Sequence, residues 1–104
     1  MKSDLDRAFA DLASTFLAKH PEVQHEWREV RNRAWGDRVD LICGVGSPNE
    51  VYASLLDWQI AIGVSGEDHD DFEDFGRGLS DQAVAAEAFE RFVQLLRERG
   101  HVAG

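Results

Sequence analysis

Apolar residues spaced three and four apart predict a helix near each end of the chain. The first covers residues 3–19 and the second covers residues 80–99, and Ser3 and Ser80 stand where N-cap residues are expected. Pro21 ends the first helix, because the residue before a proline avoids the helical backbone region. The two apolar stripes consist of Leu5, Ala8, Phe9, Leu12, Ala13 and Phe16, and of Ala85, Ala88, Phe89, Phe92, Leu95 and Leu96.

The region between the helices alternates apolar and polar residues, as strands do. Residues 22–35 fit both a strand and a helical stripe, and we favour the strand because Trp35-Gly36-Asp37 is typical of a tight turn. Residues 38–44 predict the next strand, and residues 45–49 predict a turn.

Residues 50–64 predict either one long, bent strand or two antiparallel strands with a break near Leu56-Asp57-Trp58. We favour the break, because Asp57 is a poor strand residue and each half has a normal strand length. Seven residues of this region share one phase of a two-residue repeat, which predicts that they share one face of the sheet. They are Tyr52, Ser54, Leu56, Trp58, Ile60, Ile62 and Val64.

These elements together predict a single α+β domain that comprises residues 1–104. We expect an antiparallel meander of three to four strands, because sequential strands with short connections pair with one another. An N-terminal and a C-terminal helix then cover one face, which makes a two-layer sandwich. The other face of the sheet is left open.

The charge of the chain is unevenly distributed along the sequence. The formal net charge is −9, from 20 acidic and 11 basic residues. Residues 39–76 contain nine acidic residues and no Lys or Arg, so the remainder has 11 of each sign. Such a surface disfavours nucleic acid, whose phosphates require positive charge, and it favours a basic protein partner.

Most of this charge lies in one short stretch, which we interpret as a loop that binds the partner. We expect Phe75 to be buried, because Gly76 follows it and the chain must turn there; Phe72 or Phe75, if exposed instead, is a candidate interface anchor. A calcium site is disfavoured, since Phe72 and Leu79 occupy positions where an EF-hand loop needs oxygen ligands. We predict no metal and no cofactor. The candidate partner-binding residues are Glu67, Asp68, His69, Asp70, Asp71, Phe72, Glu73 and Asp74.

Catalytic chemistry finds little support in the sequence, and we predict that the protein is not an enzyme. Cys43 could act as a nucleophile with His25, His69 or His101 as its base. The cysteine lies in the middle of a predicted strand within the acidic third of the chain, however. We therefore interpret it as a small buried hydrophobic residue.

A resemblance to a known class of proteins rests on residues 57–76, whose sequence is DWQIAIGVSGEDHDDFEDFG. A late strand that ends in glycine is followed by a histidine among carboxylates and then by the last helix. This order resembles small acidic bacterial immunity proteins, which are encoded beside polymorphic or contact-dependent inhibition toxins and block one cognate toxin. The resemblance implies a role as a toxin inhibitor and assigns no catalytic residue.

These observations predict a cytoplasmic monomer or weak dimer that neutralises a basic toxin domain by binding it. Nuclease toxins have basic clefts for phosphate, which an acidic surface can fill. A cytoplasmic location is expected because the N-terminus lacks a secretory pattern, no apolar run is long enough for a membrane span, and there is one cysteine. The alternative is a small-molecule-binding or accessory dimeric protein that uses the open sheet face, which Trp and His on that face would favour.

Overall fold

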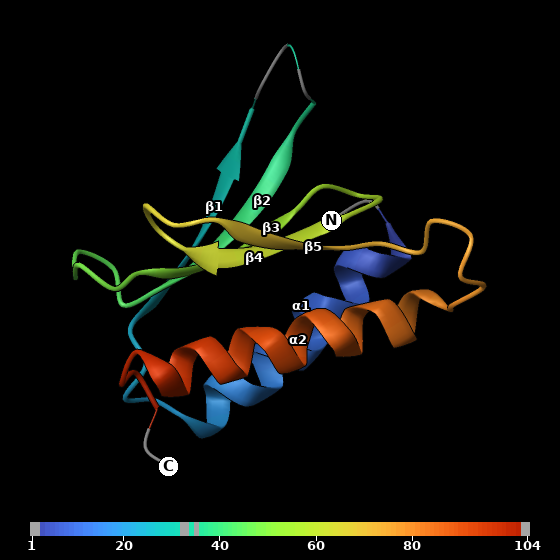
Figure 1. Cartoon of the computed structure of the whole chain (residues 1–104). Helices are drawn as coiled ribbons and strands as arrows, with labels where there is room; N and C mark the ends of the chain where they lie inside the picture. Colours follow the sequence, from blue (N-terminus) through green and yellow to red (C-terminus); the bar gives the residue numbers. More distant parts are fainter. Residues whose placement is uncertain (1–2, 32–33, 35, 103–104) are drawn as a thin grey trace.

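The computed structural model describes residues 3–31, 34 and 36–102 of the chain. Within these ranges, a pair of helices packs against one face of a five-stranded antiparallel sheet (Figure 1). The α+β sandwich is therefore confirmed, with five strands instead of three to four. The elements are α1 (Asp4–Lys19), β1 (His25–Val30), β2 (Arg38–Cys43), β3 (Val51–Leu55), β4 (Ile60–Val64), β5 (His69–Phe72) and α2 (Asp81–Glu98).

The sheet is a simple meander in which each strand pairs with the next strand of the sequence. One row across it contains Trp27, Leu41, Ala53, Ile62 and Asp70, from β1 to β5. Directly opposed residues of paired strands lie on the same face, and the central three of this row are completely buried. This row therefore marks the face that the helices cover.

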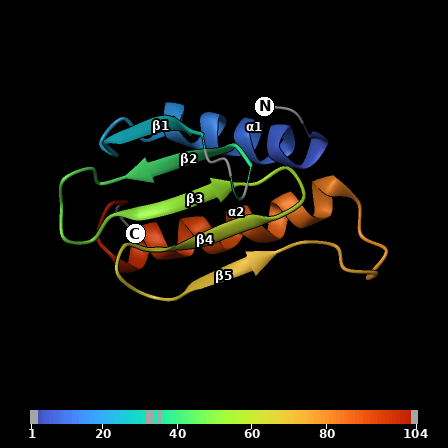
Figure 2. The ribbon, with the colours of Figure 1, turned by 90° about the horizontal axis from the view of Figure 1, so that it is seen from above.

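Both helices begin as the sequence predicts. The Ser3 hydroxyl accepts a hydrogen bond from the Asp6 amide at 3.1 Å, and the Ser80 hydroxyl accepts one from the Ala83 amide at 3.1 Å. Seen from above, α1 lies along the β1 side of the sheet and α2 lies under β3 and β4 (Figure 2). Within the described residues, neither helix combines the length and the apolar character that a membrane span requires.

The ambiguous segment after α1 forms a strand, as favoured, over His25–Val30. Its Trp27 is partly buried and packs against the core. Of the predicted turn, Gly36 has a positive φ of 85°, a conformation that glycine adopts without strain. Trp35 lies outside the described residues.

The predicted break between β3 and β4 is confirmed, but the shared phase of the two halves is wrong. The chain reverses at a two-residue turn, Asp57-Trp58, where the Leu56 amide donates to the Gln59 carbonyl at 2.9 Å. Because the chain reverses at this turn, Tyr52 and Ser54 of β3 do not share a face with Ile60 and Ile62 of β4. The residues buried on the helix side are Val51, Ala53 and Leu55 of β3 and Ile60, Ile62 and Val64 of β4.

The acidic stretch is partly a strand, so its interpretation as a loop was wrong for residues 69–72, whereas residues 67–68 and 73–74 lie outside the strand. His69–Phe72 form β5, which pairs with β4 along the edge of the sheet. Aspartate has a low strand propensity, but pairing with β5 satisfies the backbone groups along the outer side of β4 and outweighs that preference. The strand that was not predicted is therefore β5, and it contains two of the acidic residues of the predicted loop, Asp70 and Asp71.

The core predicts a sharp contrast between two Phe→Ala substitutions. Phe92 is completely buried and contacts Phe9 edge-to-face, with ring centroids 5.8 Å apart, whereas Phe75 is 79% exposed. We expect Phe92→Ala to lower the free energy of unfolding by about 3–5 kcal/mol and Phe75→Ala to lower it by less than about 1 kcal/mol. Urea unfolding followed by circular dichroism measures both, and equal midpoints would contradict the packing of α2.

Candidate functional site

Two exposed aromatic residues meet at one end of the sheet, and we call them the aromatic pair. Trp58 belongs to the turn between β3 and β4 and is 60% exposed, and Phe75 follows β5 and is 79% exposed. Their ring centroids lie 6.4 Å apart. Large aromatic side chains that remain together at the surface are typical of binding sites.

The exposure of Phe75 corrects the prediction that it is buried. Phe72, the other phenylalanine of the acidic stretch, packs against the core instead. Because side chains alternate along β5, Phe72 lies on the helix side, in the row of Leu55 and Ile60. The chain then leaves the sheet before it reaches Phe75, so the core no longer covers that ring.

Unusual backbone conformations coincide with the aromatic pair. Among the described residues, two non-glycine residues have a positive φ, namely Asp57 at 73° and Phe75 at 39°. One directly precedes Trp58 and the other belongs to the pair itself. The two-residue turn requires the positive φ of Asp57, which aspartate tolerates, whereas a positive φ costs a phenylalanine about 1 kcal/mol or more. Backbone conformations of the second kind cluster at functional sites.

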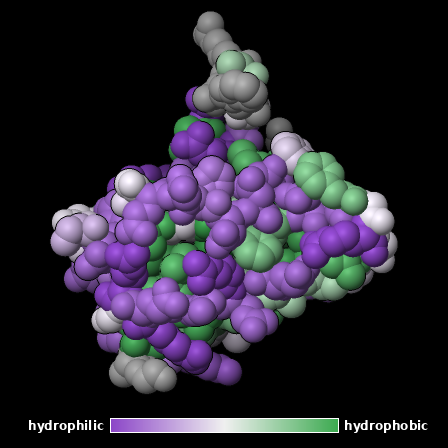
Figure 3. Space-filling view, viewed as in Figure 1, coloured by the Kyte–Doolittle hydropathy of each residue, from purple (hydrophilic) through white to green (hydrophobic). Residues whose placement is uncertain are grey.

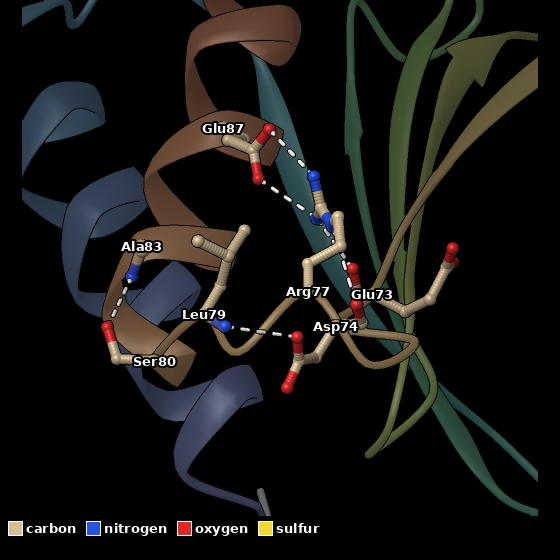
Figure 4. A network of polar contacts seen from close by, with 7 residues as sticks. All are labelled: Glu73, Asp74, Arg77, Leu79, Ser80, Ala83 and Glu87. Atoms are coloured by element: carbon tan, nitrogen blue, oxygen red, sulfur yellow. Dashed lines mark hydrogen bonds and ion pairs between the residues drawn. The ribbon is translucent and has the colours of Figure 1, made fainter.

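The loop that carries Phe75 is held by a network around Arg77 (Figure 4). The Arg77 guanidinium donates to the Glu73 carbonyl at 2.6 Å and to the Asp74 carbonyl at 3.4 Å, and it forms an ion pair with Glu87 of α2 at 3.1 Å. The Asp74 carboxylate accepts a hydrogen bond from the Leu79 amide at 3.1 Å. These bonds tie the loop to itself and to α2, so the backbone that carries the exposed ring is held in place.

A buried carboxylate supports the other half of the aromatic pair. Asp6 in the first turn of α1 is only 2% exposed, and its Oδ2 accepts a hydrogen bond from the Asp57 amide at 3.1 Å. Its Oδ1 is buried and has no hydrogen-bond partner within the described chain. Burial, together with the nearby Asp57 carboxylate, raises the pKa of Asp6 to about 6. Asp6 thus links α1 to the turn that presents Trp58.

The structure separates the predicted partner-binding residues onto different faces. In β5, His69 and Asp71 lie on the open face and contact each other at 3.1 Å, whereas Asp70 and Phe72 lie on the helix side. Asp70 forms an ion pair with Arg91 of α2 at 2.9 Å. The four predicted residues that form β5 therefore point to both sides of the sheet.

Arginines of α2 and its C-cap bind some of the negative charge. Besides Asp70, Glu67 is bound by Arg99, at 2.9 Å to each carboxylate oxygen. Over the described ranges of the chain, Asp68, Asp71 and Glu73 form no ion pair with an arginine. The face of the molecule drawn in Figure 3 is mostly hydrophilic, and apolar side chains lie at its surface in separate patches.

The open face of the sheet contains a shallow hollow of about 550 Å³. Tyr52 lines it above Gly63, where an added Cβ would come within 2.9 Å of the Tyr52 hydroxyl. Burial raises the pKa of Tyr52, and Asp40 and Asp71 add to the shift. A ligand site on the open face was predicted to contain Trp and His. His69 lines the hollow, whereas Trp27 and Trp58 do not.

Cys43 is completely buried, as its interpretation as a hydrophobic residue requires. Burial raises the pKa of its thiol to about 12, so the reactive thiolate is not populated near neutral pH. Within the described ranges, no three His, Cys, Asp or Glu side chains are grouped so that they could hold a metal ion.

Comparison with protein-family models, with curated proteins and with solved structures finds no match for this chain. Its function is therefore inferred from its own residues. Sequence reasoning missed Asp6 and Trp58 as members of a site. The one signal for them was Asp57, a poor strand residue directly before an aromatic residue.

The raised pKa of Asp6 predicts how stability depends on pH. The ordinary value is 3.8 and the folded value is about 6, so the folded state binds the extra proton between these values and loses stability as pH rises through them. Asp6→Asn keeps the acceptor for the Asp57 amide and removes the charge. We expect the stability of this variant relative to the parent to increase by about 2 kcal/mol between about pH 4.5 and pH 7.5.

Urea unfolding of both proteins at the two pH values measures this change. Because the comparison is between two proteins at each pH, titration of the carboxylates that do not interact with Asp6 cancels. An equal difference in stability at both pH values would show that Asp6 has an ordinary pKa.

Proposed function

We propose that this protein binds a basic protein partner through the aromatic pair and the carboxylates around it. The observation that carries the proposal is the presence of two exposed aromatic rings on a strained backbone, which the contacts of Asp6 and Arg77 hold in place. A protein keeps such costly features where they serve recognition. Aromatic anchors with a polar rim are the usual arrangement of binding hot spots.

The rim of this surface is negative, which determines the kind of partner. Asp57 and Asp74 directly precede the two aromatic residues, and Glu73 comes one position earlier. A lysine or arginine of the partner can bind a carboxylate here and also pack on the face of an aromatic ring. The rings then supply affinity, and the net charge of −9 speeds the encounter.

The biological role that we propose is immunity against a toxin. The partner is then a basic toxin domain, such as a nuclease, which the protein inhibits by occupying its phosphate-binding cleft. Support comes from the acidic character of the chain and from the resemblance of residues 57–76 to immunity proteins. Catalysis is not needed for this role, and we propose that the protein acts by binding alone, in the cytoplasm where such a toxin acts.

The hollow on the open sheet face favours a second candidate function, the binding of a small molecule. Tyr52 and His69 offer hydrogen bonds there, and Ile42 and Ala61 provide an apolar floor. We rank this function second, because the hollow is shallow and its rim carries charges of both signs from Arg28, Asp40 and others, so no one ligand class is selected.

Growth rescue tests the immunity role. The toxin domain encoded beside the gene for this chain is expressed in a bacterial host, alone and together with the chain. We expect the native chain to restore growth and the double variant Trp58→Ala/Phe75→Ala to fail, since it lacks both anchors. The variant should fold normally, because both rings are exposed.

The matched control is Tyr52→Ala, which alters the hollow on the open face and leaves the aromatic pair intact. Rescue by the control but not by the double variant would support the proposed surface. If the double variant restores growth like the native chain, the aromatic pair is not the binding site.

Electrostatic steering predicts a second effect on the same complex. Asp68→Asn/Asp71→Asn removes two charges that no arginine of the described chain binds. We expect slower association and a weaker dependence on salt, with little change in dissociation. Stopped-flow association at low and physiological salt measures this.

The control for steering is Asp11→Asn/Glu22→Gln, which changes the net charge equally but on α1 and the loop after it, on the other side of the molecule from β5. A steering surface near β5 predicts a smaller effect for this control. Equal effects of the two variants would place the binding surface elsewhere.

A further inference from the structure

A second cavity lies on the helix side of the molecule, between the β1–β2 hairpin and the β3–β4 turn. Its volume is about 380 Å³. Val30, Val39 and Leu55 provide apolar lining, and Asp6 and Asp57 lie at the same cavity. Neither the aromatic pair nor the hollow on the open face occupies this space, although Asp57 connects it to the aromatic pair.

The two oxygens of Asp6 are in different situations. The hydrogen bond from the Asp57 amide occupies Oδ2 at 3.1 Å, whereas Oδ1 has no partner within the described chain. Asp6 is only 2% exposed, so bulk water does not compensate for the missing bond. A buried carboxylate oxygen without a donor is costly, and a ligand that supplies the donor would remove the cost.

The charges around the cavity select a cation. Besides Asp6 and Asp57, the carboxylates of Glu29 and Asp37 line it, against two arginines, Arg31 and Arg38. The Arg38 guanidinium donates to the Asp40 carboxylate at 3.1 and 3.2 Å and is thereby partly neutralised. Among the described residues that line the cavity, four carboxylates against two guanidinium groups leave an excess of negative charge for a ligand to balance.

We propose that this cavity binds a primary ammonium group carried on an aliphatic chain. One unpartnered oxygen suits the compact ammonium, whereas a guanidinium binds best to two unpartnered oxygens of a carboxylate, and Oδ2 already accepts one hydrogen bond. The apolar lining of Val39 and Leu55 accommodates the methylene groups. A divalent metal is a poor fit, since the described residues contain no group of ligands suited to one.

The ammonium can come from a free alkylamine or from a lysine side chain of a partner. Asp57 lines the cavity and precedes Trp58, so a lysine bound here would lie beside the aromatic pair. The binding of an amine goes beyond the proposed function and does not depend on it.

Titration of the native protein with n-butylammonium at about pH 7.5, followed by NMR, tests the proposal. We expect saturable shifts of the Val39 and Leu55 methyl groups and of the Asp57 amide, with an affinity on the order of millimolar for so small a ligand. n-Butanol has the same chain without the charge, and n-butyrate has the opposite charge, so neither should saturate these signals. No saturable shift with n-butylammonium, or equal shifts with n-butanol, would overturn the proposal.

Variants test the role of Asp6 in the same titration. Asp6→Asn should weaken n-butylammonium binding at least about tenfold, whereas Asp11→Asn, with the same change of charge at an exposed site of α1, should not. Unchanged binding in Asp6→Asn overturns the proposal, and if that variant does not fold, the comparison with n-butanol and n-butyrate decides. Nα-acetyl-lysine methylamide distinguishes the two sources: its binding supports a lysine side chain, and its failure beside n-butylammonium binding supports a free amine.

Discussion

Burial of the central strands against the two helices is the interaction on which the rest of the structure depends. Ala53 of β3 and Ile62 of β4 are completely buried, as is Phe92 of α2. Because side chains alternate along a strand, this contact determines the face of every other residue in the sheet. It turns Phe72 of β5 toward the core, and it brings Asp70 within 2.9 Å of Arg91.

Patterns within short stretches of the sequence predicted the helices, their N-caps and the order of the strands, because these features depend on interactions between residues close in the sequence. The helical stripes, the caps Ser3 and Ser80, and the meander all follow from spacing, hydrogen-bonding side chains and short connections. The phase of β3 could not be derived in the same way. A two-residue turn changes the pairing of inward and outward positions, and the alternation that runs from Tyr52 to Val64 conceals that change.

The candidate site was predicted less well, because it depends on contacts between distant residues. Asp6 and Asp57 are far apart in the sequence, and only folding brings the buried carboxylate to the amide of the turn. Charge is a second example. Residues 39–76 contain no Lys or Arg, yet Arg91 and Arg99 bind carboxylates of this region in the folded chain. Acidic and basic residues that are separated along the sequence are therefore not separated in the folded protein.

The costs that the fold accepts are concentrated at one end of the molecule. A positive φ costs Phe75 about 1 kcal/mol or more, and the two-residue turn also holds Asp57 at a positive φ. The buried Asp6 adds the cost of a desolvated carboxylate. Glycine at either strained position would relieve the backbone, and asparagine in place of Asp6 would relieve the charge. Instead, the chain has Asp57 and Phe75 at these two positions and the buried carboxylate of Asp6 beside them. Because proteins are only marginally stable, such costs are a significant part of the free energy of unfolding. Stability therefore does not explain this end of the molecule, whereas recognition of a basic partner explains why its aromatic rings and carboxylates lie together.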